Sequence, residues 1–230
     1  MKITWLGHGS FRIEVAGRVL LLDPWLSGNP VLPEDRHEDA VAGATHILLT
    51  HTHFDHVVDV LPLAKKLNIP VAGQYDLMSH WAEHEGIETI GFNKGGTVDL
   101  GGPKVSMVPA SHSSTFASAE GLRHGGSEVG FVIAGDGHAL YCSGDTGLMA
   151  DMDWIADYHK PDIGILSAGG HFTMDMAQVA YAAKRWFAFR TLIPCHYKTF
   201  PLLEQSAQTL IDALPDVKVI EPQVMQAIEV

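Results

Sequence analysis

One short segment constrains the fold of this chain more than any other, the hexapeptide HTHFDH at residues 51–56. It directly follows residues 45–50, whose apolar centre is typical of a strand buried on both faces. In a tight turn after a strand, its three imidazoles can converge on one point, and neutral imidazoles are good ligands for zinc-like cations. Asp55 adds an anionic oxygen beside them. The segment therefore predicts a metal site at a strand end, and the alternative is a surface histidine cluster without a ligand role.

The remaining pattern predicts sheets packed face to face with helices outside, because hairpins come first and strands then alternate with helices. Apolar residues at helical spacing predict a helix over 57–67. Strands are predicted at 2–6, 11–15, 18–22, 105–109, 129–134, 139–142, 163–166, 192–195 and 217–220, and further helices at 151–158, 176–187 and 202–214. Two segments, 28–43 and 111–127, are predicted to be irregular loops.

Length and charge exclude several classes of protein. The chain has 230 residues without a repeat or a composition shift, which predicts one domain over residues 1–230. Its 15 basic and 27 acidic residues give a net charge of −12, which argues against a nucleic-acid partner. No apolar run reaches the roughly 18 residues that a membrane span needs, and charges interrupt the first 22 residues where a signal peptide would have its apolar core.

Cys142 and Cys195 each lie in an apolar stretch. Two buried free thiols are expected in a reducing compartment, so the chain is predicted to be cytoplasmic.

Three more ligand candidates share one placement, just past the end of a predicted apolar strand. His112 follows the strand at 105–109, Asp145 follows the strand at 139–142, and His196 follows the strand at 192–195. Strand ends on one side of a sheet form a common rim, where functional sites collect. Together with residues 51–56, these side chains would complete two coordination spheres.

This order of motifs resembles the metallo-β-lactamase superfamily: His-x-His-x-Asp-His, a later lone His, an Asp after Ser-Gly, and a late His. The segment LLDP at 21–24 is similar to the early aspartate motif of the superfamily. The segments WLGHGSF at 5–11, GGHFTMD at 169–175 and CHYKTFP at 195–201 resemble a bacterial and archaeal group of metal-dependent hydrolases, related to ascorbate-6-phosphate lactonase. The resemblance extends from residue 3 to about residue 220.

The resemblance implies an α/β fold, the αβ/βα four-layer sandwich of the superfamily, with the metal site at one sheet edge. It also implies two divalent metal ions, zinc or manganese first and nickel or iron as alternatives, that share a bridging hydroxide. The resemblance implies that His51, His53 and His112 hold one ion. It implies that Asp55, His56 and His196 hold the other ion, and that Asp145 bridges the two.

Further residues have implied or open roles around the metals. Asp55 would also orient the hydroxide, and Asp23 would brace the 51–56 loop or cap a strand. His8 would donate a hydrogen bond to substrate or be structural. We expect His171, after a Gly-Gly turn, to stabilise the developing oxyanion without ligating a metal.

The function indicated by the sequence is a metal-dependent hydrolase that attacks a small ester-like bond in a lactone, phosphodiester or thioester. The alternative is a protein of the same fold that binds metal or ligand without turnover. The expected partner is a small-molecule substrate, which is anionic if Lys198 and Arg123 contact it and are not merely solvated. No nucleic acid and no membrane are expected as partners, and the sequence leaves the oligomeric state open.

Overall fold

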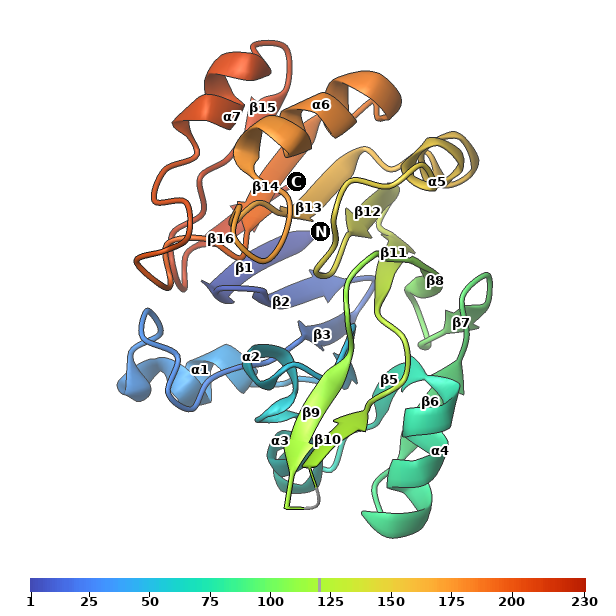
Figure 1. Ribbon diagram of the computed structural model, residues 1–230. Coiled ribbons are helices and arrows are strands. Elements are labelled where there is room, and N and C mark those ends of the chain that lie inside the picture. Colours follow the sequence, from blue (N-terminus) through green and yellow to red (C-terminus); the bar gives the residue numbers. More distant parts are fainter. Residues whose placement is uncertain (120) are drawn as a thin grey trace.

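The computed structural model describes residues 1–119 and 121–230, in which two seven-stranded sheets face each other (Figure 1). In order across the first sheet, the strands are β16 (Ala227–Glu229), β1 (Lys2–Gly7), β2 (Ser10–Val15), β3 (Arg18–Leu22), β4 (His46–Leu48), β5 (Val71–Gln74) and β6 (Thr89–Phe92). The pairs from β16 to β3 are antiparallel, and those from β3 to β6 are parallel.

The second sheet repeats this plan of an antiparallel part joined to a parallel part. In order across it, the strands are β15 (Lys218–Val219), β14 (Thr191–Cys195), β13 (Ile163–Ser167), β12 (His138–Cys142), β11 (Val129–Gly135), β8 (Lys104–Pro109) and β7 (Thr97–Asp99). A separate two-stranded hairpin, β9 (Thr115–Ser118) with β10 (Gly121–His124), leaves the second sheet after β8.

Helices cover the outer face of each sheet (Figure 1). On the first sheet they are η1 (Glu34–Arg36), α1 (His37–Val41), α2 (Phe54–Val57), α3 (Val60–Leu67) and α4 (Tyr75–His84). On the second sheet they are α5 (Met152–His159), α6 (Met176–Trp186) and α7 (Gln208–Ala213). Among the described residues, each helix is too short or too polar to cross a membrane.

The alternation of side chains along β3 and β4 explains the layers. Leu20, Leu22 and Leu48 belong to the core between the sheets, whereas Leu21 and Ile47 belong to the core under α1, α3 and α4. Successive side chains of a strand point to opposite faces, so strands that are apolar throughout must be covered on both sides. The result is the αβ/βα sandwich that the sequence predicted.

The predicted elements differ from the structure in several places. Segment 28–43 contains η1 and α1, and segment 111–127 contains β9 and β10, so neither is a wholly irregular loop. The predicted helix at 57–67 is interrupted before α3, because the Asp59 carboxylate accepts hydrogen bonds from the backbone of Leu26 and Ser27.

The helix predicted at 202–214 begins only at Gln208. Before it, the Glu204 amide donates to the Gly169 carbonyl and the Lys198 amide donates to the Glu204 carbonyl. These tertiary hydrogen bonds replace the helical ones that the apolar spacing suggested.

Candidate metal centre

All seven predicted ligands meet at one edge of the sandwich, where the two sheets contribute differently. The loop after β4 and the first turn of α2 supply four of them, His51, His53, Asp55 and His56. The second sheet supplies one residue after each of three strands: His112 after β8, Asp145 after β12 and His196 after β14. All three therefore lie just past the end of a strand, as the sequence predicted.

The carboxylate of Asp145 lies at the centre of this group. Its Oδ2 is 3.8 Å from His51 Nε2 and 3.7 Å from His112 Nε2. The same oxygen is 3.4 Å from His56 Nε2 and 2.9 Å from His196 Nε2. Burial by itself would raise the pKa of the Asp145 carboxyl, but His196 and His56 outweigh burial and hold it well below its usual range. An ionised carboxylate thus faces four imidazoles.

The first set of donors is His51, His53 and His112, whose ligand atoms lie within 4.8 Å of one another. His51 Nε2 is 3.1 Å from His53 Nδ1, and the ring of His112 packs against both. Burial lowers the pKa of all three imidazoles, most strongly at His51. Three neutral imidazoles are a donor set suited to a zinc-like cation.

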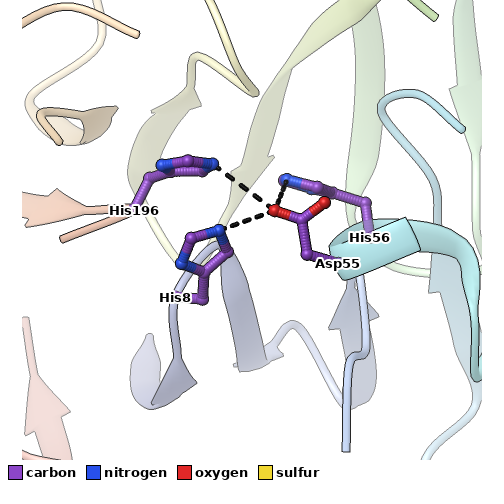
Figure 2. Close-up of side chains that lie close together, drawn as sticks. All are labelled: His8, Asp55, His56 and His196. Carbon is purple, nitrogen blue, oxygen red and sulfur yellow. Dashed lines mark hydrogen bonds and ion pairs between the residues drawn. The ribbon is translucent and has the colours of Figure 1, made fainter. Parts of the chain in front are cut away.

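The second set of donors is Asp55, His56 and His196, which together with His8 form a cluster whose ligand atoms lie within 4.8 Å of one another (Figure 2). Asp55 Oδ2 lies 3.6 Å from His196 Nε2 and 3.8 Å from His56 Nε2. His56 Nε2 is buried without a hydrogen-bond partner. Burial would lower the pKa of His56, but the carboxylates of Asp145, Asp23 and Asp55 outweigh it and raise that pKa well above its usual value. A buried, unpartnered nitrogen among carboxylates fits a metal ligand.

Asp23 braces the ligand loop as the sequence suggested. Its buried carboxylate accepts hydrogen bonds from His56 Nδ1 at 2.8 Å, from the Thr50 amide at 2.8 Å and from the Thr50 hydroxyl at 2.5 Å. Thr50 Oγ1 also lies 2.9 Å from His51 Nδ1. One carboxylate thus orients two ligand rings, leaving the Nε2 atom of each for the metal side.

The side chain of His8 is completely buried, which favours a structural role over contact with substrate. His8 Nε2 is 2.7 Å from Asp55 Oδ2 and Nδ1 is 2.9 Å from Thr199 Oγ1 (Figure 2). Burial, with His196 nearby, lowers the pKa of His8 to about 4. The Asp55 carboxylate accepts from Nε2 and Thr199 Oγ1 lies against Nδ1, so the ring is held at both nitrogens and His8 positions a ligand carboxylate.

The catalytic assignment of His171 finds no support in the structure either. His171 follows β13 on the expected rim, but it is exposed and lies outside the residues that line the cavity at the cluster. Its described ring contact is with Phe172, whose own ring centre lies 6.5 Å from that of His196. At this point of the rim it is therefore Phe172, and not His171, that lines the cavity.

The two cations considered for an anionic substrate are placed differently. Arg123, on β10, lines the cavity. Lys198 is paired with Glu221 and is not among the cavity residues described.

Two glycines leave room for the ligand rings. A Cβ on Gly9 would lie 2.7 Å from His56 Cε1, and a Cβ on Gly169 would lie 2.1 Å from the His196 carbonyl oxygen. The roles of Thr50 and Thr199 were not predicted. Their signal was adjacency in sequence, since Thr50 precedes the hexapeptide and Thr199 follows His196 by three positions.

The cluster opens into a cavity of about 1490 Å³. His53, Asp55, His112, Asp145 and His196 line it at one part. Elsewhere its lining comes from α2, α3, α4 and the β9–β10 hairpin. Substrate therefore has access to the donor atoms of both sets.

A sandwich of this kind with such a donor set at its edge is typical of a metallohydrolase, and comparison with known proteins indicates the same class. The family model described as the beta-lactamase superfamily domain matches residues 18–197. A UPF0173 metal-dependent hydrolase of Ruegeria pomeroyi is 75% identical over 230 residues and covers all of both chains. One from Paracoccus denitrificans is 63% identical over 228 residues, 99% of both chains.

Among solved structures, a metallo hydrolase from the hyperthermophilic archaeon Ignicoccus hospitalis matches with a TM-score of 0.84 and 30% identity, over 100% of this chain and 98% of that one. An isothiocyanate hydrolase from Delia radicum gut bacteria matches with a TM-score of 0.76 but 19% identity, which shows the shared fold alone. The chain belongs to the metallo-β-lactamase superfamily and is a metal-dependent hydrolase.

Proposed function

We propose that this hydrolase holds two divalent ions and cleaves a small ester-like bond, in a lactone, a phosphodiester or a thioester. One observation carries the two-ion proposal: Asp145 Oδ2 lies within 3.8 Å of imidazole nitrogens from both donor sets. A carboxylate placed in this way can bridge two cations. Each set then adds three donors of its own, which is enough for two ions.

His51, His53 and His112 would hold the first ion, and Asp55, His56 and His196 the second. Mixed imidazole and carboxylate donors favour zinc or manganese, with nickel or iron as alternatives. When bound, the ions supply a water made acidic near neutral pH and positive charge for the oxyanion of the attacked group.

The chain's own residues keep Asp55 ionised and oriented. Burial would raise the pKa of the Asp55 carboxyl, but His56, His196 and His8 outweigh burial and lower it far below its usual range. A carboxylate of such low basicity stays ionised, so it is suited to accept a hydrogen bond from the attacking water. The His8 ring, fixed by Thr199, holds Oδ2 in place for this role.

A small-molecule substrate fits the chain better than a nucleic acid. The net charge of −12 disfavours phosphate backbones. We place the reaction in the cytoplasm, because Cys142 and Cys195 are both free thiols, as expected in a reducing compartment.

The test is turnover by the metal-free and the metal-reconstituted chain on a panel of lactones, aryl esters, thioesters and phosphodiesters. We expect one bond class to be hydrolysed by the reconstituted chain only, and Asp145→Asn to abolish this rate. A chain that retains its ions but turns over none of the four classes would favour metal or ligand binding without turnover.

A further inference from the structure

The cavity beside the cluster has an apolar part that the proposed reaction does not need. We call this part the apolar groove and define it by Val58, Leu61, Leu77, Trp81 and Phe116, all of which line the cavity. Val58 and Leu61 come from the end of α2 and from α3, and Leu77 and Trp81 come from α4. Phe116 comes from β9, so the β9–β10 hairpin also lines the groove.

Several exposed large apolar side chains gather around this one cavity. In the described part of the chain eleven large apolar side chains are exposed, and five of them line this one cavity: Phe54, Val58, Phe116, Phe172 and Leu202. Soluble proteins rarely leave a contiguous apolar surface uncovered unless it binds something. The cavity volume of about 1490 Å³ also exceeds the range of roughly 300–1,000 Å³ that is usual for small-molecule sites.

The hairpin that carries Phe116 is anchored to the ligand loop at its base. The Gly125 amide donates to the Ser114 carbonyl at 2.9 Å, and the Thr52 amide donates to Ser114 Oγ at 3.3 Å. A Cβ on Gly125 would lie 2.0 Å from Thr52 Oγ1, so only glycine lets these segments pass this closely. The groove is therefore fixed relative to His51 and His53, which flank Thr52 in sequence.

The charges away from the cluster do not select an anionic occupant. Asp76 and Glu85 line the cavity together with Arg123, so the carboxylates outnumber the guanidinium. Glu85 is ion-paired with Lys65 at 2.8 Å, and Asp76 accepts from Gln74 at 3.0 Å. The lining that remains for contact is mainly aliphatic and aromatic.

We propose that the substrate carries an acyl or alkyl chain next to its scissile bond and that the apolar groove binds this chain. The proposal rests on the proposed function, because the cluster supplies the reacting end of the same cavity. A bare lactone or acetyl ester would leave the groove unfilled. An aliphatic chain of several carbons would bury its methylenes against Val58, Leu61 and Phe116, and each buried methylene strengthens binding.

The test is binding of uncharged ester mimics that cannot be hydrolysed, the 2-alkanones from 2-butanone to 2-nonanone. Their Kd for the metal-reconstituted chain is measured by isothermal titration calorimetry. We expect the Kd to fall by about two- to fourfold for each added methylene. Phe116→Ala should weaken the longest ketone about tenfold and 2-butanone less than twofold, and Val58→Ala should act in the same direction.

Leu122→Ala is the matched control, since Leu122 lies on the same hairpin, is 78% exposed and is not among the cavity residues. It should bind every ketone as the parent does. A Kd independent of chain length, or equal weakening by Leu122→Ala and Phe116→Ala, would overturn the proposal.

Metal content, measured on the same samples, separates the two proposals. Two ions with a flat ketone series reject chain binding and leave the dinuclear site standing. Fewer than two ions with a length-dependent series reject the dinuclear site and leave the groove as a binding site for apolar chains.

Discussion

The two sheets build the two sides of the metal centre in different ways. The first sheet places four ligands within six consecutive residues, on one loop that a single carboxylate, Asp23, orients. The second sheet contributes His112, Asp145 and His196, which are separated by 33 and 51 positions in sequence (145 − 112 and 196 − 145). The first side is therefore a local structure, and the second side depends on the register of three strands. Substitutions on the two sides should therefore differ in how they affect metal binding and stability.

Asp145→Asn should have the largest effect, because Asp145 contacts donors of both sets. The neutral amide removes the negative charge that faces four imidazoles, so both ions should bind more weakly. We expect turnover of the best panel substrate to fall by at least about a thousandfold. His196→Ala is the comparison, and it should release only the second ion, as measured by metal analysis. Equal metal contents in the two variants would contradict a bridging role for Asp145.

Asp23→Asn tests the brace of the first-sheet loop. The amide cannot accept from His56 Nδ1, Thr50 N and Thr50 Oγ1 as the carboxylate does, so the rings of His51 and His56 should lose their fixed orientation. We expect metal affinity to fall by about 10- to 100-fold, measured by competition with a chelator. Unchanged affinity would show that the loop orients its ligands without Asp23.

Gly169→Ala tests the second-sheet side through packing. The added methyl would lie 2.1 Å from the His196 carbonyl oxygen, so the turn that carries His196 must move. We expect a loss of about 1–3 kcal/mol in the free energy of unfolding, measured by urea denaturation, together with weaker binding of the second ion. Gly147→Ala is the matched control, because a Cβ there meets only one atom, at 3.8 Å. Equal stability of the two variants would contradict this account of the turn.

His171→Ala should have the smallest effect. It distinguishes the catalytic role that the sequence predicted from the position outside the cavity lining that the structure shows. A donor to the oxyanion would be worth two to three orders of magnitude in turnover. Because His171 is exposed and outside the cavity lining, we expect less than about a threefold change in kcat/KM with both ions retained. A loss of a hundredfold or more would restore the catalytic assignment.

The difference between the two sheets also explains which site residues could be predicted from the sequence. The ligands of the first sheet are predictable because they are contiguous. His112, Asp145 and His196 are predictable only through the rule that strand ends share a rim, together with the resemblance to a family. Sequence position gave the place of His8 and His171 but not the direction of their rings. His8 has a positive φ of 55° in its turn, which directs its ring inward to Asp55.

The secondary structure that was missed has a similar cause. The hairpin β9–β10 lies in a stretch of small and polar residues without alternating apolar positions, so no local pattern marks it. The helix predicted at 202–214 does not form over 202–207, because the apolar residues there serve tertiary packing instead, with Leu203 and Ala207 buried. Both errors arise where contacts distant in sequence override the local preference.

In the proposed dinuclear site, one carboxylate from the second sheet, Asp145, would serve two separate metal positions. The most direct test is metal content after the metal-free chain is reconstituted with excess zinc or manganese and freed of unbound ions. We expect close to two ions per chain for the parent and close to one for His196→Ala. At most one ion per chain in the parent, with either metal, would contradict the proposed dinuclear site.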